Sequence, residues 1–252
     1  WRINQSGSGC LCRIPRDPWG PKDHGHLELS GQGIETPIPN PWAVIFDWDN
    51  TLVDTFPVIR DALNTTLLAF GHAPWTMDET RQRVRRSARE SFPELFGDEW
   101  ERAMDLFYNR YYEIHTEKLE IIAGARELIE RLASKSLTLS IVSNKRGDVL
   151  RAEVAHLGWT GYFSAIVGAN DAPRDKPARD PVDLALWGTN IPTGPHVWFI
   201  GDADIDLECA KNADCTAILV GTQLRSAHSP YAAQADIEFP HCIALSNFLD
   251  KL

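Results

Sequence analysis

Two carboxylates stand two residues apart at the end of a short apolar run. Asp47 and Asp49 follow this run within the stretch VIFDWDNTLVDT, residues 44–55. Polar side chains also follow three later apolar runs, namely Ser143 with Asn144, Lys176, and Asp202 with Asp206. In a doubly wound parallel sheet, ligands bind beyond the carboxyl ends of the strands, so we expect these side chains to converge.

The chemistry of these side chains is that of a cation site. Clustered carboxylates repel one another in a folded protein, so they need a cation beside them. An oxygen-rich site with few protein ligands suits Mg²⁺, which keeps several waters and shares itself with substrate phosphate. A lone Asp-x-Asp pair is more often a turn or a helix cap, but four coordinated segments favour the cation site. If a helix has begun there, Asp206 lies one turn beyond Asp202.

The elements that must position these residues are predicted to form a parallel sheet with crossover helices. From Trp42 onward, short β-rich apolar runs alternate with longer helical patterns, as in α/β proteins. The runs are nearly continuous, as expected for strands covered on both faces. The predicted fold class is α/β, a doubly wound Rossmann-like parallel sheet. Its predicted strands are 42–47, 137–142, 163–168, 196–201 and 215–220, with a shorter edge strand at 236–239.

A small α-helical cap domain is predicted between the first two strands, because that gap is too long for one crossover helix. The helical patterns in it are 57–70, 77–90 and 98–118, separated by Gly71, Pro74, Pro93 and Gly97. A helix over 124–134 then returns the chain to the sheet. The predicted domains are an irregular segment 1–41, a catalytic core of 42–55 and 121–252, and a helical cap of 56–120.

Composition excludes several classes of function. The formal net charge of −10 argues against general nucleic-acid or anionic-membrane binding. No apolar segment approaches the roughly 20 residues of a membrane span. The five cysteines form no paired framework and are interpreted as reduced. We therefore predict a cytoplasmic protein with neither nucleic acid nor membrane as a partner. A monomer or a homodimer is expected.

The first 41 residues are rich in Gly, Pro and Ser and show little periodicity. The chain starts at Trp1, and no Met precedes Met77. One hypothesis is that the recorded sequence is a fragment or begins upstream of the true start.

The four polar segments together resemble the motifs of the haloacid dehalogenase superfamily, in its phosphatase branch with a helical cap. FDWDNTLVDT is similar to the first motif, VSN to the second, the lysine of DKPARDP to the third and GDADID to the fourth. The pattern is nearest to that of phosphoglycolate phosphatase-like members. Asn50 and Asp214 stand where the family more often has Gly, and both residue types tolerate a left-handed backbone.

The resemblance implies a Mg²⁺-dependent phosphomonoester hydrolase acting on a small, phosphoglycolate-like metabolite. Asp47 would be the nucleophile and form an aspartyl-phosphate. Asp49 would protonate the leaving alcohol and then activate the hydrolytic water. Asp47, the backbone carbonyl of Asp49, and Asp202 would hold Mg²⁺, with Asp206 as a further ligand or as a partner of a metal-bound water.

The same resemblance implies a set of phosphoryl contacts. The hydroxyl of Ser143, the backbone N–H of Asn144 and the ammonium of Lys176 would contact the phosphoryl oxygens, and Thr51 would add a further hydroxyl. Lys145 is a rival for the lysine role because it follows the second motif directly. Lys176 is preferred, since its surroundings match the family pattern and a charged residue beside a strand end is usually solvated.

The arginine-rich run of residues 81–91 is the candidate for substrate selection. The hypothesis is that Arg85 or Arg86 binds an anionic group of a small phosphorylated acid. The alternative is a solvated helix face, because charge runs usually face water. His115 and His156 are interpreted as packing or surface residues.

Other readings of the four motifs stay open. A phosphomutase would share the nucleophile and the acid/base. A binding or regulatory protein could retain the fold without catalysis, although all the expected catalytic residue types are present. Phosphonate hydrolysis is disfavoured, because it would need a Schiff-base lysine in the cap. Lys118 is the only lysine between residues 56 and 120, and it lies near the end of the insertion.

Overall fold

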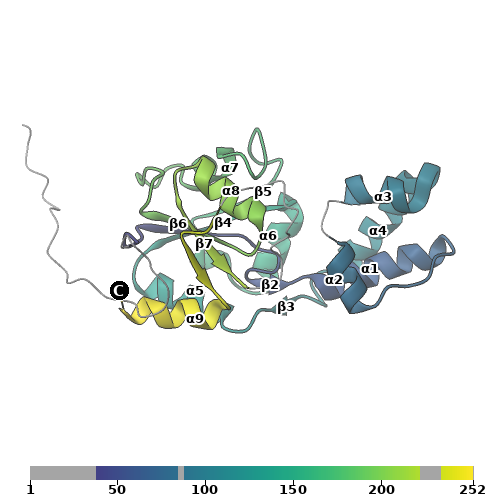
Figure 1. Ribbon diagram of the computed structural model, residues 1–252, viewed down its shortest axis with the longest axis horizontal. Helices are drawn as coiled ribbons and strands as arrows, with labels where there is room; N and C mark the ends of the chain where they lie inside the picture. Colours follow the sequence, from purple (N-terminus) through teal and green to yellow (C-terminus); the bar gives the residue numbers. More distant parts are fainter. Residues whose placement is uncertain (1–37, 85–87, 222–233, 252) are drawn as a thin grey trace, which may run out of the picture. The chain divides into compact units, whose positions relative to one another are not determined.

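The computed structural model of the protein describes residues 38–84, 88–221 and 234–251 (Figure 1). Residues 1–37 of the predicted irregular segment lie outside these ranges, as do Arg85 and Arg86. No helix within the described ranges combines the length and apolar character needed to cross a bilayer. The cysteines in the described part of the chain are buried and free: Cys209, Cys215 and Cys242.

Six parallel strands form one sheet in the order β5-β4-β1-β6-β7-β8. The strands are β1 (Ala43–Phe46), β4 (Thr138–Arg146), β5 (Ala165–Ala169), β6 (Val197–Gly201), β7 (Thr216–Val220) and β8 (Ile237–Phe239). The chain runs outward from β1 in one direction through β4 and β5, and in the other through β6, β7 and β8. The strand order therefore reverses beside β1, and the predicted fold class is confirmed.

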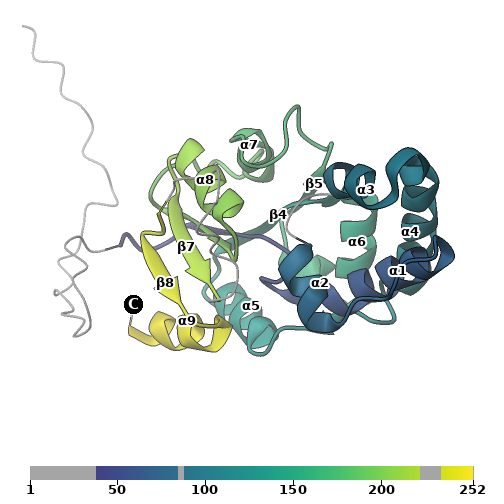
Figure 2. The ribbon, with the colours of Figure 1, turned by 45° about the vertical axis from the view of Figure 1, so that its right-hand side comes forward.

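Helices cover both faces of this sheet, and β1 supplies side chains to both layers. Val44 and Phe46 belong to one apolar cluster, together with residues of α5 and α9. Ala43 and Ile45 belong to a second cluster, with residues of α7 and α8. Figures 1 and 2 show α5 and α9 on one face and α7 and α8 on the other. The helices are α5 (Ala125–Ser134), α6 (Gly147–His156), α7 (Asp180–Ala185), α8 (Asp204–Asn212) and α9 (Cys242–Phe248), with short 3-10 turns at Thr160–Tyr162 and Leu249–Lys251.

A group of helices lies between two short strands that pair with each other. Strands β2 (Val53–Asp54) and β3 (Glu120–Ile121) are antiparallel, so the chain leaves and returns side by side. The helices between them, called the helical insertion below, share an apolar cluster that includes Leu63, Phe92 and Phe107 and also contains Val149 of α6. They are α1 (Phe56–Ala69), α2 (Met77–Arg83), α3 (Ala88–Phe96) and α4 (Trp100–Ile114), with a 3-10 turn at Gly97–Glu99.

Two helix predictions in the insertion were wrong. The predicted helix 77–90 is broken, because α2 ends at Arg83. Pro93 was expected to separate helices but lies inside α3. Phe92 and Phe96 on either side of it are buried in the insertion's apolar cluster, and this packing compensates for the hydrogen bond that proline cannot donate. Periodicity alone did not reveal either effect.

The left-handed backbone expected at two motif positions is present. Asn50 has φ 61° and Asp214 has φ 58°. Asn50 lies in the turn that follows β1, where its N–H donates to the carbonyl of Val53 at 2.7 Å. The turn after the first strand is therefore built without glycine, as the tolerance of Asn for this conformation allows.

The close approach of β5 to the start of α6 leads to a stability prediction. A Cβ at Gly168 would lie 2.4 Å from the Cα of Gly147, so backbone would have to move. Gly168→Ala should lower the free energy of unfolding by about 1–3 kcal/mol, as overpacking does. Gly161→Ala is the matched control, because a Cβ there meets nothing within 4 Å. Urea unfolding followed by circular dichroism measures both, and equal stabilities would contradict the close packing.

Candidate active site

Asp47 and Asp202 lie at the same edge of the sheet because β1 and β6 are neighbouring parallel strands. Phe46 is paired with Ile200 in the register of these strands. The backbone N–H of Asp47 donates to the carbonyl of Ile200 at 2.8 Å, so sheet hydrogen bonding extends to Asp47. Asp202 follows Ile200 by two residues, and Asp206 falls in the first turn of α8. The two acidic motifs are thus brought together as predicted.

Three carboxylates form a compact cluster at this edge. Asp47, Asp202 and Asp206 each offer an oxygen, and these atoms all lie within 4.8 Å of one another. All three residues are buried. The hydroxyl of Thr51 lies 3.5 Å from Asp47 Oδ2 and 3.3 Å from Asp202 Oδ1. Asp49 is different, because its side chain is 30% exposed and its carboxylate pairs elsewhere.

Lys176 lies within this carboxylate cluster. Its Nζ is 2.5 Å from Asp47 Oδ1 and 2.7 Å from Asp206 Oδ1, and its side chain is 3% exposed. The loop that carries it is fixed by Asn144, whose Nδ2 donates to the carbonyl of Lys176 and whose Oδ1 accepts from its N–H, each at 3.0 Å. Only the backbone N–H of Asn144 was expected to contribute to the site, so the anchoring of the lysine loop by its side chain was missed.

The charges in the cluster do not balance. One ammonium faces three carboxylates, which leaves two negative charges in excess. Burial raises the pKa of Asp47 to about 7, with Asp206 and Asp49 adding to the rise and Lys176 opposing it. Burial also raises the pKa of Asp202, and the charges of Asp206 and Asp47 raise it further. A buried, oxygen-only donor set with this excess fits a hard divalent cation such as Mg²⁺.

Glycine is required at the end of β6. A Cβ at Gly201 would lie 2.3 Å from Cβ and 2.4 Å from Cγ of Asp206. The absence of a side chain lets the first turn of α8 approach the strand end, where Asp206 Oδ2 accepts from the N–H of Ala203 at 3.1 Å. The glycine of the GDADID motif therefore determines where Asp206 lies.

Ser143 lies on the neighbouring strand at the same edge. Strand β4 is paired with β1 through Ile141 and Phe46, so Ser143 follows that pair by two residues. The buried Ser143 hydroxyl accepts from the N–H of Lys145 at 3.3 Å. β4 extends four residues beyond the predicted end, with a shift in register between Val142 and Arg146. Ser143 and Asn144 are therefore strand residues rather than loop residues.

A second polar cluster surrounds Asp49. The Nζ of Lys145 lies 2.6 Å from Asp49 Oδ1 and 2.7 Å from Glu153 Oε2, and the Lys145 side chain is only 8% exposed. Burial lowers the pKa of Lys145, but the charges of Asp49, Tyr111 and Glu153 outweigh it, so the net change is upward. The expectation that a charged residue at this position is solvated was wrong, because two carboxylates hold the ammonium inside the protein.

Glu153 is the functional candidate that sequence reasoning missed. It is fully buried on α6 and contacts Trp48, Tyr111 and His115 as well as Lys145. His115 is buried, but it contacts this carboxylate and not only apolar neighbours. A signal was present, because Glu153 shares the apolar side of its helix with Leu150 and Val154. Glu is almost never fully buried unless it is paired.

Comparison with known proteins identifies the family. The profile of the haloacid dehalogenase-like hydrolases matches residues 44–220. This chain belongs to that family. A phosphoglycolate phosphatase of Rhodobacter capsulatus is 32% identical over 178 residues, which cover 68% of this chain and 80% of the relative. The predicted family, and the likeness to its phosphoglycolate phosphatase-like members, are confirmed.

Solved structures agree with this assignment. The crystal structure of a haloacid dehalogenase superfamily hydrolase from Ehrlichia chaffeensis is similar, with a TM-score of 0.60 and 31% identity over 86% of this chain and 99% of the other. A haloacid dehalogenase-like protein from Streptococcus pneumoniae has a TM-score of 0.71 at 20% identity, covering 82% of this chain and 97% of that one. The second likeness shows the fold alone.

The raised pKa of Asp47 in this hydrolase predicts a pH-dependent stability difference. Its folded-state pKa of about 7 lies above the ordinary 3.8, so the cost of ionising Asp47 is fully present above pH 7 and is relieved progressively as the pH falls from 7 towards 3.8. The cost is roughly 4 kcal/mol at most. Without metal, Asp47→Asn should therefore melt higher than the parent at pH 8, with a smaller advantage at pH 5.5.

Thermal unfolding in EDTA at both pH values measures this difference. Asp214→Asn is the matched control, because it makes the same chemical change at a side chain that is 80% exposed. A constant difference between Asp47→Asn and the parent across this pH range would contradict the raised pKa.

The carboxylate cluster also predicts binding of Mg²⁺ to the folded state. At 100 times its dissociation constant, the ion should stabilise the protein by about 2.7 kcal/mol. For a chain of this size, that corresponds to a rise in melting temperature of roughly 5–10 °C. Asp202→Asn should remove the shift, because it deletes one of the three carboxylates.

Glu208→Gln is the control for this measurement, because it removes one negative charge from α8 outside the cluster. Differential scanning fluorimetry with increasing MgCl₂ measures the rise in melting temperature of each variant. An Asp202→Asn variant that keeps the full Mg²⁺ shift would contradict the assignment of the cluster as the cation site.

Proposed function

We propose that the protein is a Mg²⁺-dependent phosphomonoester hydrolase that works through an aspartyl-phosphate on Asp47. The observation that carries this proposal is the division of the two motif acids. Asp47 lies in the carboxylate cluster beside Lys176, whereas the carboxylate of Asp49 pairs with Lys145. We therefore assign Asp47, which lies beside the Lys176 ammonium in the proposed cation site, as the nucleophile, and Asp49, which lies outside this cluster, as the residue that transfers protons.

The first chemical step forms a bond between Asp47 Oδ and phosphorus and breaks the bond from phosphorus to the ester oxygen. Asp49, as the carboxylic acid, gives its proton to the departing alcohol. Lys176 reduces the repulsion between the Asp47 carboxylate and the anionic phosphoryl group. In the second step, Asp49 takes a proton from the water that attacks phosphorus, and Asp47 leaves as a carboxylate.

The metal site is proposed to consist of Asp47, the backbone carbonyl of Asp49, and Asp202. When bound, Mg²⁺ would neutralise charge on the phosphoryl oxygens and favour in-line displacement. Both oxygens of Asp206 have protein partners, so we assign it to orienting Lys176 and a metal-bound water. Ser143, the backbone N–H of Asn144 and Thr51 are proposed to contact the remaining phosphoryl oxygens.

The substrate is proposed to be a small phosphorylated acid of the phosphoglycolate type. The name of the Rhodobacter capsulatus relative, phosphoglycolate phosphatase, supports this choice. Arg85 and Arg86 remain the proposed contacts for the substrate's second anionic group, on the basis of the sequence alone. A cytoplasmic location and a monomeric or homodimeric state also remain predictions from the sequence.

The test is phosphate release from a panel of phosphorylated metabolites, with and without Mg²⁺. The parent should release phosphate only with the metal, and phosphoglycolate should be among the best substrates. Asp47→Asn should lose turnover, because an amide cannot form the acyl-phosphate, while Asp214→Asn should behave as the parent. Acid quenching followed by mass spectrometry should detect a phosphoryl adduct on Asp47. Release of isomerised sugar phosphate without free phosphate would instead identify a mutase.

A further inference from the structure

The mechanism above leaves the second buried lysine without a role. Lys145 contacts Asp49, whereas Lys176 contacts Asp47, so each of the two motif acids has its own ammonium. We propose that Lys145 is a positioning residue that holds the Asp49 carboxylate for proton transfer, and that Glu153 links this residue to helix α4 of the insertion. This inference rests on the proposed function, because it assigns Asp49 as the acid/base.

The contact between Lys145 and Asp49 constrains the carboxylate of Asp49. The two atoms lie 2.6 Å apart, and Oδ1 of Asp49 is buried without an aligned hydrogen bond. Attraction to the Lys145 ammonium is therefore what fixes this oxygen. The ammonium itself has little freedom, because its side chain is 8% exposed and Glu153 Oε2 holds it from the other side at 2.7 Å.

Glu153 uses its two oxygens in different directions. Oε2 accepts from Lys145 and, at 2.7 Å, from the indole N–H of Trp48, the residue between the two motif acids. Oε1 accepts from the hydroxyl of Tyr111 at 3.3 Å and lies 3.0 Å from Nδ1 of His115. One oxygen thus fixes the loop that carries the acids, and the other holds the end of α4.

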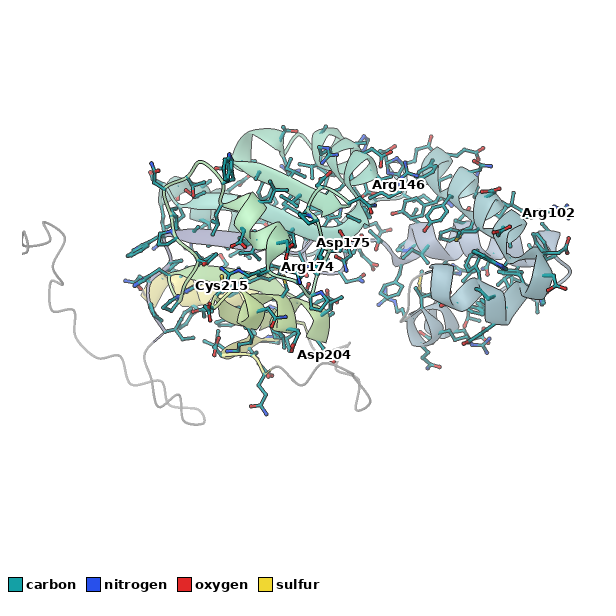
Figure 3. All side chains as sticks on the ribbon, turned by 90° about the horizontal axis from the view of Figure 1, so that it is seen from above. Arg102, Arg146, Arg174, Asp175, Asp204 and Cys215 are labelled. Atoms are coloured by element: carbon teal, nitrogen blue, oxygen red, sulfur yellow. The ribbon has the colours of Figure 1, made fainter. Side chains whose placement is uncertain are left out.

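A neighbouring contact supports this link between β4 and α4. Arg146, which follows Lys145, donates to the hydroxyl of Tyr112 at 2.5 Å and lies 5.0 Å from the centre of its ring. Figure 3 shows Arg146 on the side of the sheet domain that faces the insertion. Lys145 Nζ also lies 5.8 Å from the ring centre of Tyr111. Lys145 and Arg146 of β4 therefore contact two successive tyrosines of α4, Tyr111 and Tyr112.

This geometry separates two possible roles of Lys145. A lysine that bound the phosphoryl group would assist both chemical steps for every substrate. A lysine that positions Asp49 assists only the transfers in which Asp49 gives or takes a proton. With an aryl phosphate, the leaving group departs without a proton, so formation of the aspartyl-phosphate is insensitive to Asp49 while its hydrolysis still depends on it.

The experiment is rapid-mixing kinetics with p-nitrophenyl phosphate on the full chain with Mg²⁺. In Lys145→Met, nitrophenolate should appear in a burst of about one equivalent per active site, followed by a steady state reduced at least roughly tenfold, at the lower end of general acid–base effects. Lys145→Arg should recover most of the steady-state rate, because it restores the positive charge. With an alkyl phosphate, Lys145→Met should show no burst and a low kcat.

The link to α4 is tested with Tyr111→Phe, which removes one hydrogen bond to Glu153 Oε1. Tyr111→Phe should give the same nitrophenolate burst as Lys145→Met, with a smaller reduction in the steady-state rate. Tyr108→Phe is the matched control on the same helix and should keep the parent kinetics. The ring of Tyr108 stacks on Tyr112, and its hydroxyl is not among the groups that hold Glu153 in the described part of the chain. The double variant Lys145→Met with Glu153→Gln should be no slower than Lys145→Met alone, since both act through Asp49.

Each outcome decides the proposal. Loss of the burst together with the steady state in a folded Lys145→Met would overturn it in favour of a phosphoryl contact. Parent-like kinetics of Lys145→Met would overturn it while leaving the proposed function intact. A parent without turnover on any phosphate would overturn both. If Lys145→Met does not fold, Tyr111→Phe carries the decision, with a burst supporting the proposal and parent kinetics overturning it.

Discussion

Repulsion among three buried carboxylates is the constraint on which the rest of the site depends. Asp47, Asp202 and Asp206 lie within 4.8 Å of one another with a single ammonium between them. No apolar packing can compensate such a cluster, so its cost must be balanced by cations. The parallel register of β1 with β6 and the missing side chain at Gly201 keep the three groups close despite this cost. The fold holds a site that attracts positive charge.

A single residue between the motif acids divides the site into two halves. Trp48 lies between Asp47 and Asp49 in the loop after β1, and its fully buried side chain anchors that loop in the protein interior. The two acids on either side of Trp48 thus have different surroundings: Asp47 pairs with Lys176, and Asp49 pairs with Lys145. The spacing of two residues in the motif has a physical consequence, since it gives two acids on one short loop different partners, as the two roles proposed for them require.

The sequence predicted what depends on local pattern and failed where contacts are distant. The strands and the convergence of the acidic motifs followed from apolar runs and from motif order. The choice of Lys176, which came from the family pattern, stays a prediction. Glu153 was missed because its partners, Trp48 and His115, lie 105 and 38 residues away. The helix through Pro93 depends on packing within the insertion, and no Gly or Pro in the sequence marks the end of α2 at Arg83. Hydrophobic periodicity predicts which face of a helix is buried, but it does not predict which charged side chains from distant segments lie against that face.

The polar contact between α6 and α4 contributes little net stability, because burying charged groups carries a desolvation cost. An apolar pair of similar volume would often be at least as stable as a buried ion pair. Apolar contacts, however, tolerate small shifts, whereas Glu153 is satisfied only when its donors from both sides are in place. We therefore expect this carboxylate to contribute geometry more than stability. The position of α4 and the orientation of Asp49 are then set by the same group, which couples the helical insertion to the residue proposed to transfer protons.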